Sequence, residues 1–120
     1  MTVQICSINL NLILNHFAGD EDILREVVKS FLLSAPKLIT EIETSIKDKS
    51  ARNLEISAHT LKGSVSHFFI KDLHEVLSEL ESSGRKNQFA EVQEKFESAK
   101  IKLNSLCKDL QALLLEKKAG

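Results

Sequence analysis

The sequence is poor in residues that interrupt helices and in large aromatic side chains. Its 120 residues include one Pro, four Gly, six Phe and neither Trp nor Tyr. Because Pro and Gly are the strongest helix breakers, their scarcity favours long helices. Hydrophobic residues make up 42% of the chain and charged residues 28%, which indicates a globular rather than a disordered protein. At this length we expect a single domain over residues 1–120.

No charge of one sign predominates. The 16 basic and 17 acidic residues are mixed along the chain and give a net charge of -1. The chain therefore lacks a basic stripe that could follow a phosphate backbone, and we expect no nucleic-acid partner. No apolar run approaches the roughly 18 residues of a membrane span, and the N-terminal segment does not resemble a signal peptide. We expect a cytoplasmic protein with no membrane partner.

Potential metal ligands are few and scattered. Cys6 and Cys107 lie far apart without a CxxC spacing, so we interpret them as reduced thiols that fill small apolar spaces. His67 and His74 are one heptad apart, and a metal site would also recruit His16. No second ligand pair falls at a suitable spacing, so we interpret these histidines as surface or half-buried side chains. The sequence predicts no metal and no other cofactor.

Helical periodicity extends over most of the chain, and no stretch alternates as a strand does. We expect a short helix over residues 9–17 and four longer helices over about residues 20–47, 50–68, 71–84 and 88–117. Short polar loops between amphipathic helices predict an all-α fold, an up-and-down four-helix bundle with a short additional N-terminal helix.

Several residues mark the expected helix ends. Asp20 and Ser50 are suitable N-caps, and Gly84 is a natural C-cap. Pro36 falls inside the second pattern, where we expect a kink rather than a break. Ile23 is among the apolar residues expected to face the core there.

The last helix has the most regular apolar stripe. This stripe is the wall of the protein's own core or one half of a dimeric coiled coil, and the sequence leaves both open. In the second case the protein would be a scaffold bundle that binds a signalling partner without chemistry. We favour the first interpretation and expect a monomer. The N-terminal Met and the polar C-terminal end favour a free-standing protein.

The stretch AHTLKGS, which begins at Ala58, places a histidine, a lysine and a glycine close together in the third helix. A glycine inside a helix costs about 0.5–1 kcal/mol relative to alanine, so its presence indicates a close approach of something to the backbone. When the apolar stripe faces inward, the outward side carries a group of possible docking and reactive residues. They are Glu55, His59, Lys62, Gly63 and Ser66, with Ile56 at the edge.

This group has the chemistry of a phosphoryl carrier. An exposed imidazole is largely neutral at neutral pH, so one ring nitrogen of His59 is a nucleophile. Lys62 can neutralise a phosphoryl charge, and Gly63 and Ser66 leave room for a second protein. The chain has no glycine-rich phosphate loop, no carboxylate cluster for Mg²⁺ and no catalytic triad. We therefore expect a carrier that is not an enzyme and does not bind ATP.

The same residues resemble the signature of histidine-containing phosphotransfer (HPt) domains, in which Lys and Gly follow the histidine at the third and fourth positions. The resemblance extends over essentially the whole chain. It includes the GDE-like helix start at Gly19, the F…P segment of Phe31 and Pro36, and the LE pair of Leu80 and Glu81. It implies a helical bundle that passes phosphate between receiver-domain aspartates. Its partners would be response-regulator receiver domains and a sensor or hybrid histidine kinase, with Mg²⁺ on the receiver only.

The resemblance also implies roles for single residues. His59 would accept the phosphoryl group, Lys62 would lie beside that group, and Gly63 would let the receiver close over the imidazole. Glu81 matches the position that bonds the non-reacting ring nitrogen in several members of the family.

Three positions depart from the family's pattern. Phe69 and Ile70 stand where the family usually has a small Gly-Ala pair, and His67 replaces a small or amide residue. These departures affect where the histidine helix ends and not the acceptor face.

Overall fold

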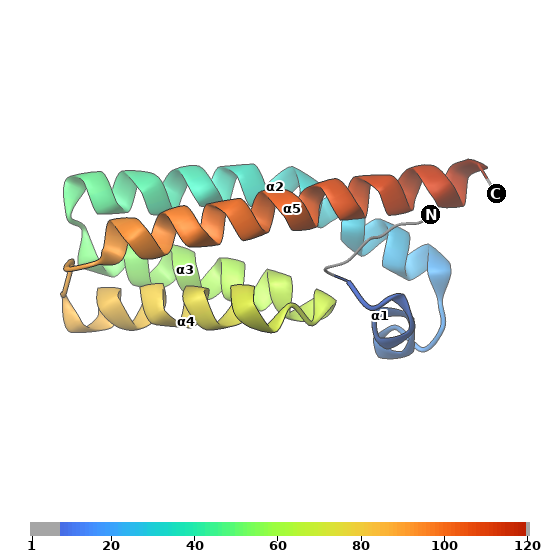
Figure 1. Ribbon diagram of the computed structural model, residues 1–120, viewed down its shortest axis with the longest axis horizontal. Helices are drawn as coiled ribbons and strands as arrows, with labels where there is room; N and C mark the ends of the chain where they lie inside the picture. Colours follow the sequence, from blue (N-terminus) through green and yellow to red (C-terminus); the bar gives the residue numbers. More distant parts are fainter. Residues whose placement is uncertain (1–7, 120) are drawn as a thin grey trace.

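A computed structural model describes residues 8–119, which form five α-helices and one 3-10 turn but no strand (Figure 1). The predicted all-α fold class is confirmed. The elements, in chain order, are α1 (Leu10–His16), α2 (Glu21–Asp48), α3 (Ala51–Val65), η1 (Ser66–Phe68), α4 (Lys71–Lys86) and α5 (Val92–Ala119).

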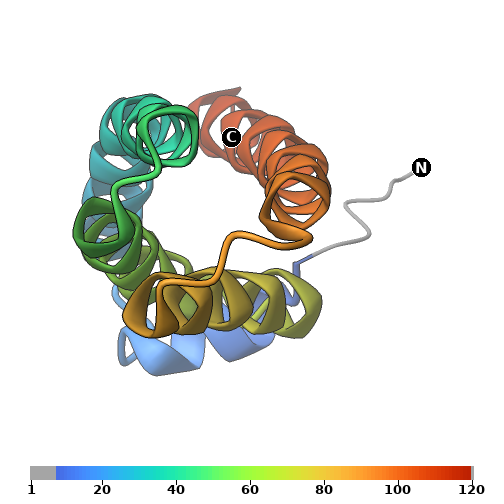
Figure 2. The same cartoon turned by 90° about the vertical axis from the view of Figure 1, so that its left-hand side faces the viewer.

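Helices α2 to α5 run alternately in opposite directions and surround one core, as the view along the bundle shows (Figure 2). Helices α2 and α5 have 28 residues each, whereas α3 and α4 have 15 and 16. The long pair therefore extends beyond the short pair at one end of the bundle. Helix α1 occupies the space left there and contacts α2 and η1 (Figure 1).

The apolar stripes predicted for the third and last helices both line this core. Every residue of the α5 stripe from Val92 to Leu113 is buried. The stripe that would also suit a coiled coil therefore packs against the other helices of this chain. Burial of each large aliphatic side chain contributes roughly 1.5–3 kcal/mol to folding. The prediction for Ile23 is wrong, because its side chain is 50% exposed and Leu24 and Val28 are buried instead.

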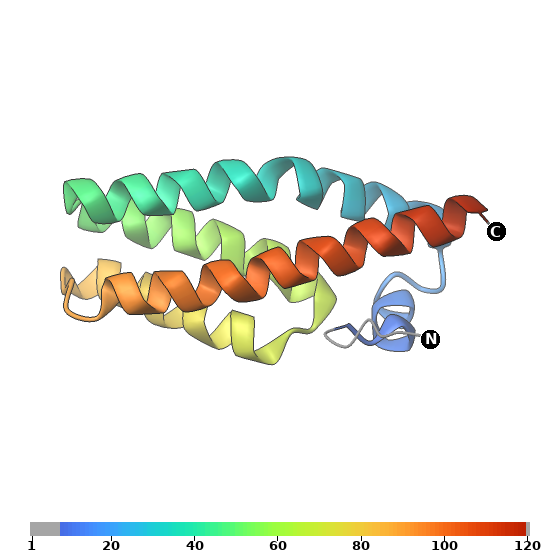
Figure 3. The ribbon, with the colours of Figure 1, turned by 45° about the horizontal axis from the view of Figure 1, so that its top comes forward.

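Local chemistry accounts for most helix ends. The side chains of Asn9 and Asp20 accept hydrogen bonds from backbone N–H groups of the first turns of α1 and α2. Ser50 occupies the N-cap position of α3 but makes no capping bond with its side chain. Helix α2 continues through Pro36, and its ribbon changes direction along its length (Figure 3).

Gly84 is not the C-cap that the sequence predicts. Helix α4 continues to Lys86, and Asn87 ends it in a left-handed conformation. Gly84 is buried, and a Cβ atom there would lie 2.6 Å from the backbone nitrogen of Glu55 and 2.7 Å from the carbonyl oxygen of Ala51. The glycine therefore allows α3 and α4 to approach each other closely.

Candidate functional site

His59 lies on the exposed face of α3, opposite the buried stripe. Its side chain is 67% exposed, and its Nδ1 atom is 3.0 Å from Oε2 of Glu81 on α4. Nε2 makes no hydrogen bond to any residue within 8–119. The close packing of α3 on α4 at Gly84 brings these two side chains together, although they are 22 positions apart in the sequence.

Glu81 is a buried carboxylate surrounded by positive groups. Only 6% of the residue is exposed. Its Oε1 atom is 2.6 Å from the ammonium of Lys62, and Oε2 is 3.0 Å from Nη2 of Arg85. Burial raises the pKa of Glu81, but hydrogen bonds and charge from Lys62 and His59 outweigh this effect, so the pKa is lowered overall. The carboxylate is therefore charged at neutral pH.

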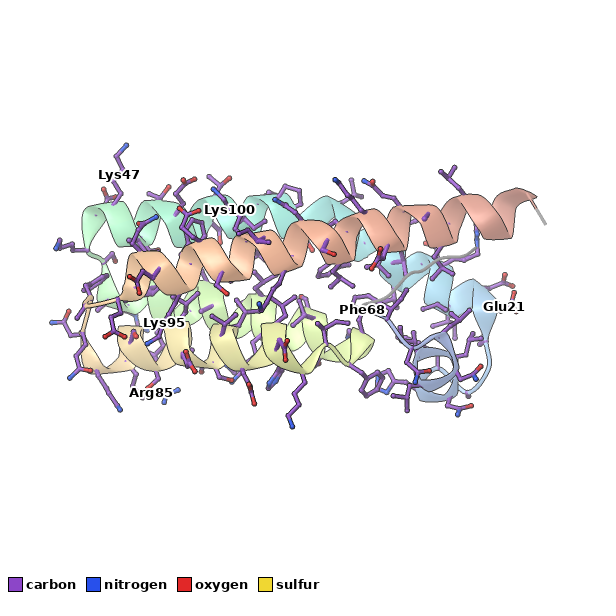
Figure 4. All side chains as sticks on the ribbon, viewed as in Figure 1. Glu21, Lys47, Phe68, Arg85, Lys95 and Lys100 are labelled. Atoms are coloured by element: carbon purple, nitrogen blue, oxygen red, sulfur yellow. The ribbon has the colours of Figure 1, made fainter. Side chains whose placement is uncertain are left out.

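Arg85 was not predicted from the sequence. It projects from α4 near the loop that precedes α5 (Figure 4). Its guanidinium lies between two carboxylates, with Nη2 3.0 Å from Glu81 Oε2 and Nε 3.4 Å from Glu55 Oε2. The spacing of four residues between Glu81 and Arg85 could have predicted their ion pair, because such residues are neighbours on a helix. The contact with Glu55 could not have been predicted in this way, because it depends on how α3 and α4 pack.

The remaining candidate docking residues lie around His59 on α3. Gly63 is exposed, and a Cβ atom there would meet nothing within 4 Å. Ser66 is also exposed, and its hydroxyl donates to the carbonyl oxygen of Gly63 at 2.6 Å. Ile56 is 49% exposed and lines a shallow hollow next to His59. Lys62, which the sequence places on the outward side, turns its ammonium toward Glu81, and its side chain is only 24% exposed.

The other histidines do not form a metal centre in the described part of the chain. Nε2 of His16 is 3.2 Å from Nδ1 of His67, and the rings of Phe17 and Phe69 pack around the pair. Among the side chains that the structure describes, in residues 8–115, no group of three His, Cys, Asp or Glu could bind a metal ion. Cys107 is a half-buried thiol whose pKa is raised by burial, and Cys6 lies outside the described residues.

The histidine helix ends at the residues that depart from the family pattern. Helix α3 gives way to the 3-10 turn η1 at Ser66, and Phe69 then adopts a left-handed conformation with φ of +59°. Glycine adopts this conformation without a steric penalty, which accounts for the small residue that the family usually has there. Phe69 is 45% exposed and contacts the ring of His16. Phe69 also lines a hollow together with the candidate docking residue Ser66.

Comparisons with known proteins identify a family and a similar fold. The sequence model of the Hpt domain matches residues 26–117. No curated protein sequence matches the chain. The fold is similar to the crystal structure of histidine-containing phosphotransfer protein B (HptB) from Pseudomonas aeruginosa PAO1, with a TM-score of 0.78 at 16% identity. The match covers 98% of this chain and 99% of that chain. None of the helices within residues 8–119 has the length and apolarity that a membrane span requires.

Proposed function

The chain belongs to the Hpt domain family and is a phosphorelay intermediate of two-component signalling, and from this we propose that it carries the phosphoryl group on Nε2 of His59. The hydrogen bond between His59 Nδ1 and Glu81 Oε2 is the observation that supports this most directly. A charged carboxylate only accepts hydrogen bonds, so Nδ1 must hold the proton. Nε2 then keeps a free lone pair on a side chain that is 67% exposed.

In the proposed reaction, the lone pair of Nε2 forms a bond to the phosphorus of an aspartyl phosphate on a receiver domain. The bond between phosphorus and the aspartyl oxygen breaks, and its electron pair leaves with the aspartate. The imidazole ring becomes positively charged, and Glu81 stabilises it through the Nδ1–H hydrogen bond. In the return transfer, the aspartate of a second receiver attacks phosphorus, and the electron pair of the P–N bond returns to Nε2.

Neighbouring residues have supporting roles in this proposal. Lys62 compensates the charge of the phosphoryl group. Gly63 and Ser66 leave space for the active site of the receiver, and Glu55 and Ile56 form part of the surface on which it docks. The open space at the Cβ position of Gly63 supports this division of roles.

Members of this family exchange phosphate with receiver domains and histidine kinases. We further propose that this chain has no ATP-binding or autokinase activity and no cofactor of its own, and that the receiver supplies Mg²⁺. The lack of a glycine-rich phosphate loop in the sequence supports this. We also propose that residues 1–120 act as a single-domain cytoplasmic monomer.

The test measures transfer of radioactive phosphate to this protein from phosphorylated receiver domains of the same organism. Wild-type protein should gain a label that is labile to acid and stable to base, and His59→Gln should gain none. His74→Gln is the matched control, because His74 is exposed on α4 and should not affect labelling. If folded His59→Gln took up as much label as wild type, the proposed acceptor would be wrong.

A further inference from the structure

Both carboxylate oxygens of Glu81 have positively charged or hydrogen-bonding partners, and these partners differ in whether they can also reach a group on His59. Lys62 contacts Oε1 at 2.6 Å, while Arg85 and His59 both contact Oε2 at 3.0 Å. Lys62 lies one helical turn from His59 on the same helix, so its flexible side chain can also reach a group on Nε2 of that ring.

A phosphoryl group on His59 therefore competes with Glu81 for Lys62. The new group adds negative charge beside the imidazole, and Lys62 is a flexible cation three positions from His59 on the same helix. If Lys62 turns toward the phosphoryl group, Oε1 of the buried Glu81 loses its closest counter-charge. A buried carboxylate without a counter-charge is strongly unfavourable, so another cation must balance it.

We propose that Arg85 is a positioning residue for phosphotransfer: it balances the charge of Glu81 so that Lys62 can turn from Glu81 to the phosphoryl group. This inference rests on the proposed role of His59. The Arg85 guanidinium is planar and permanently charged, and Glu55 holds its Nε side at 3.4 Å while Nη2 contacts Glu81. Arg85 thus acts on the reaction through Glu81 and Lys62, and it does not contact the phosphoryl group.

The experiment uses phosphoramidate, a small phosphoryl donor, with the full chain and follows phosphohistidine by ³¹P NMR. Loss of Arg85 should leave Lys62 bound to Glu81, so Arg85→Gln should slow phosphorylation about as much as Lys62→Gln does. We expect a decrease of roughly fivefold to tenfold for either change, as for the loss of one partly exposed charge. Arg85→Lys should restore part of the rate because it keeps the charge.

The double variant distinguishes this role from a direct one. If Arg85 acts through Lys62, Arg85→Gln should slow a Lys62→Gln protein by less than about twofold, because the residue it acts through is already gone. Rate effects that multiply, or no effect of Arg85→Gln in the wild-type background, would overturn the inference.

Two controls separate the possible causes of failure. Lys86→Gln removes one positive charge from the same helix as Arg85, but Lys86 is exposed and has no hydrogen bond or ion pair with Glu81 or Lys62 among the described residues, so its rate should stay within about twofold of wild type. Unfolding temperatures show that each variant is folded in the assay, and the double variant, which loses both cations beside Glu81, should have the lowest. Labelling of His59→Gln would refute the proposed function itself, whereas an unaffected Arg85→Gln protein that is still labelled at His59 would refute the Arg85 inference alone.

Discussion

At the scale of single residues, two glycines in neighbouring helices have opposite roles. Gly63 faces open space on α3, whereas Gly84 on α4 lies against the backbone of α3. From the sequence we predicted that a partner approaches the backbone closely at Gly63 and that Gly84 ends its helix. Both are glycines inside helical patterns, and only the packing of α3 on α4 distinguishes them.

The same substitution should therefore have opposite effects at these two positions. Gly63→Ala should stabilise the protein by about 0.5–1 kcal/mol, because alanine favours the helix and its methyl group meets no other atom. Gly84→Ala should destabilise it by roughly 1–3 kcal/mol, because the methyl group would overlap backbone atoms of α3. Urea unfolding curves measure both changes. Equal signs for the two variants would contradict this account of the packing.

A bulkier residue at Gly63 tests the docking surface separately from stability. Gly63→Gln should leave the bundle at least as helical by circular dichroism but should slow transfer from a receiver strongly, since the side chain would occupy the space above the α3 backbone. Phosphorylation by phosphoramidate, which is much smaller than a receiver, should change little. Transfer from a receiver at the wild-type rate would remove the explanation for this glycine.

At the scale of helices, periodicity predicted the regular elements and missed the contacts between them. The α3 and α5 stripes are buried as the steps of three and four residues indicated. Periodicity does not predict contacts between elements, because each depends on packing; the contact of Glu81 with His59 was expected only from the resemblance to HPt domains. Arg85 reaches Glu55 across α3 and α4, and the ring of His16 meets that of His67 where α1 contacts η1.

The contact between α1 and η1 should be sensitive to pH. Burial, and then the neighbouring His16, lower the pKa of His67 below its ordinary value of 6.5. The unfolded chain therefore binds a proton at His67 more readily than the folded chain does, so stability should fall as the pH falls through about 6.5 toward the lowered pKa. Unfolding free energies measured between about pH 7.5 and 5 should show this decrease.

His67→Gln should have a weaker pH dependence over the same range, because it removes the titrating group. His74→Gln is the control, since His74 is an exposed histidine of α4 and should retain the wild-type slope. A His67→Gln protein with the full slope would show that His67 does not link stability to pH.

At the scale of the whole molecule, the bundle holds a buried carboxylate beneath an exposed imidazole. The seven-residue motif identified His59 and Lys62, and the resemblance to HPt domains added Glu81. Neither indicated that Lys62 and Glu81 form an ion pair of 2.6 Å, because Lys62 belongs to α3 and Glu81 to α4, and only the packing of the two helices brings them together. The core fixes the spacing between α3 and α4, and that spacing sets the geometry around His59.

The most direct test of the central proposal is to determine which nitrogen carries the phosphoryl group. Protein labelled with ¹⁵N at histidine is phosphorylated by a phosphorylated receiver domain, and the phosphorus–nitrogen coupling is measured by NMR. The account predicts one phosphoryl group, on Nε2 of His59, with a proton on Nδ1 that is bonded to Glu81. A phosphoryl group on Nδ1 of His59, or on a different residue, would contradict it.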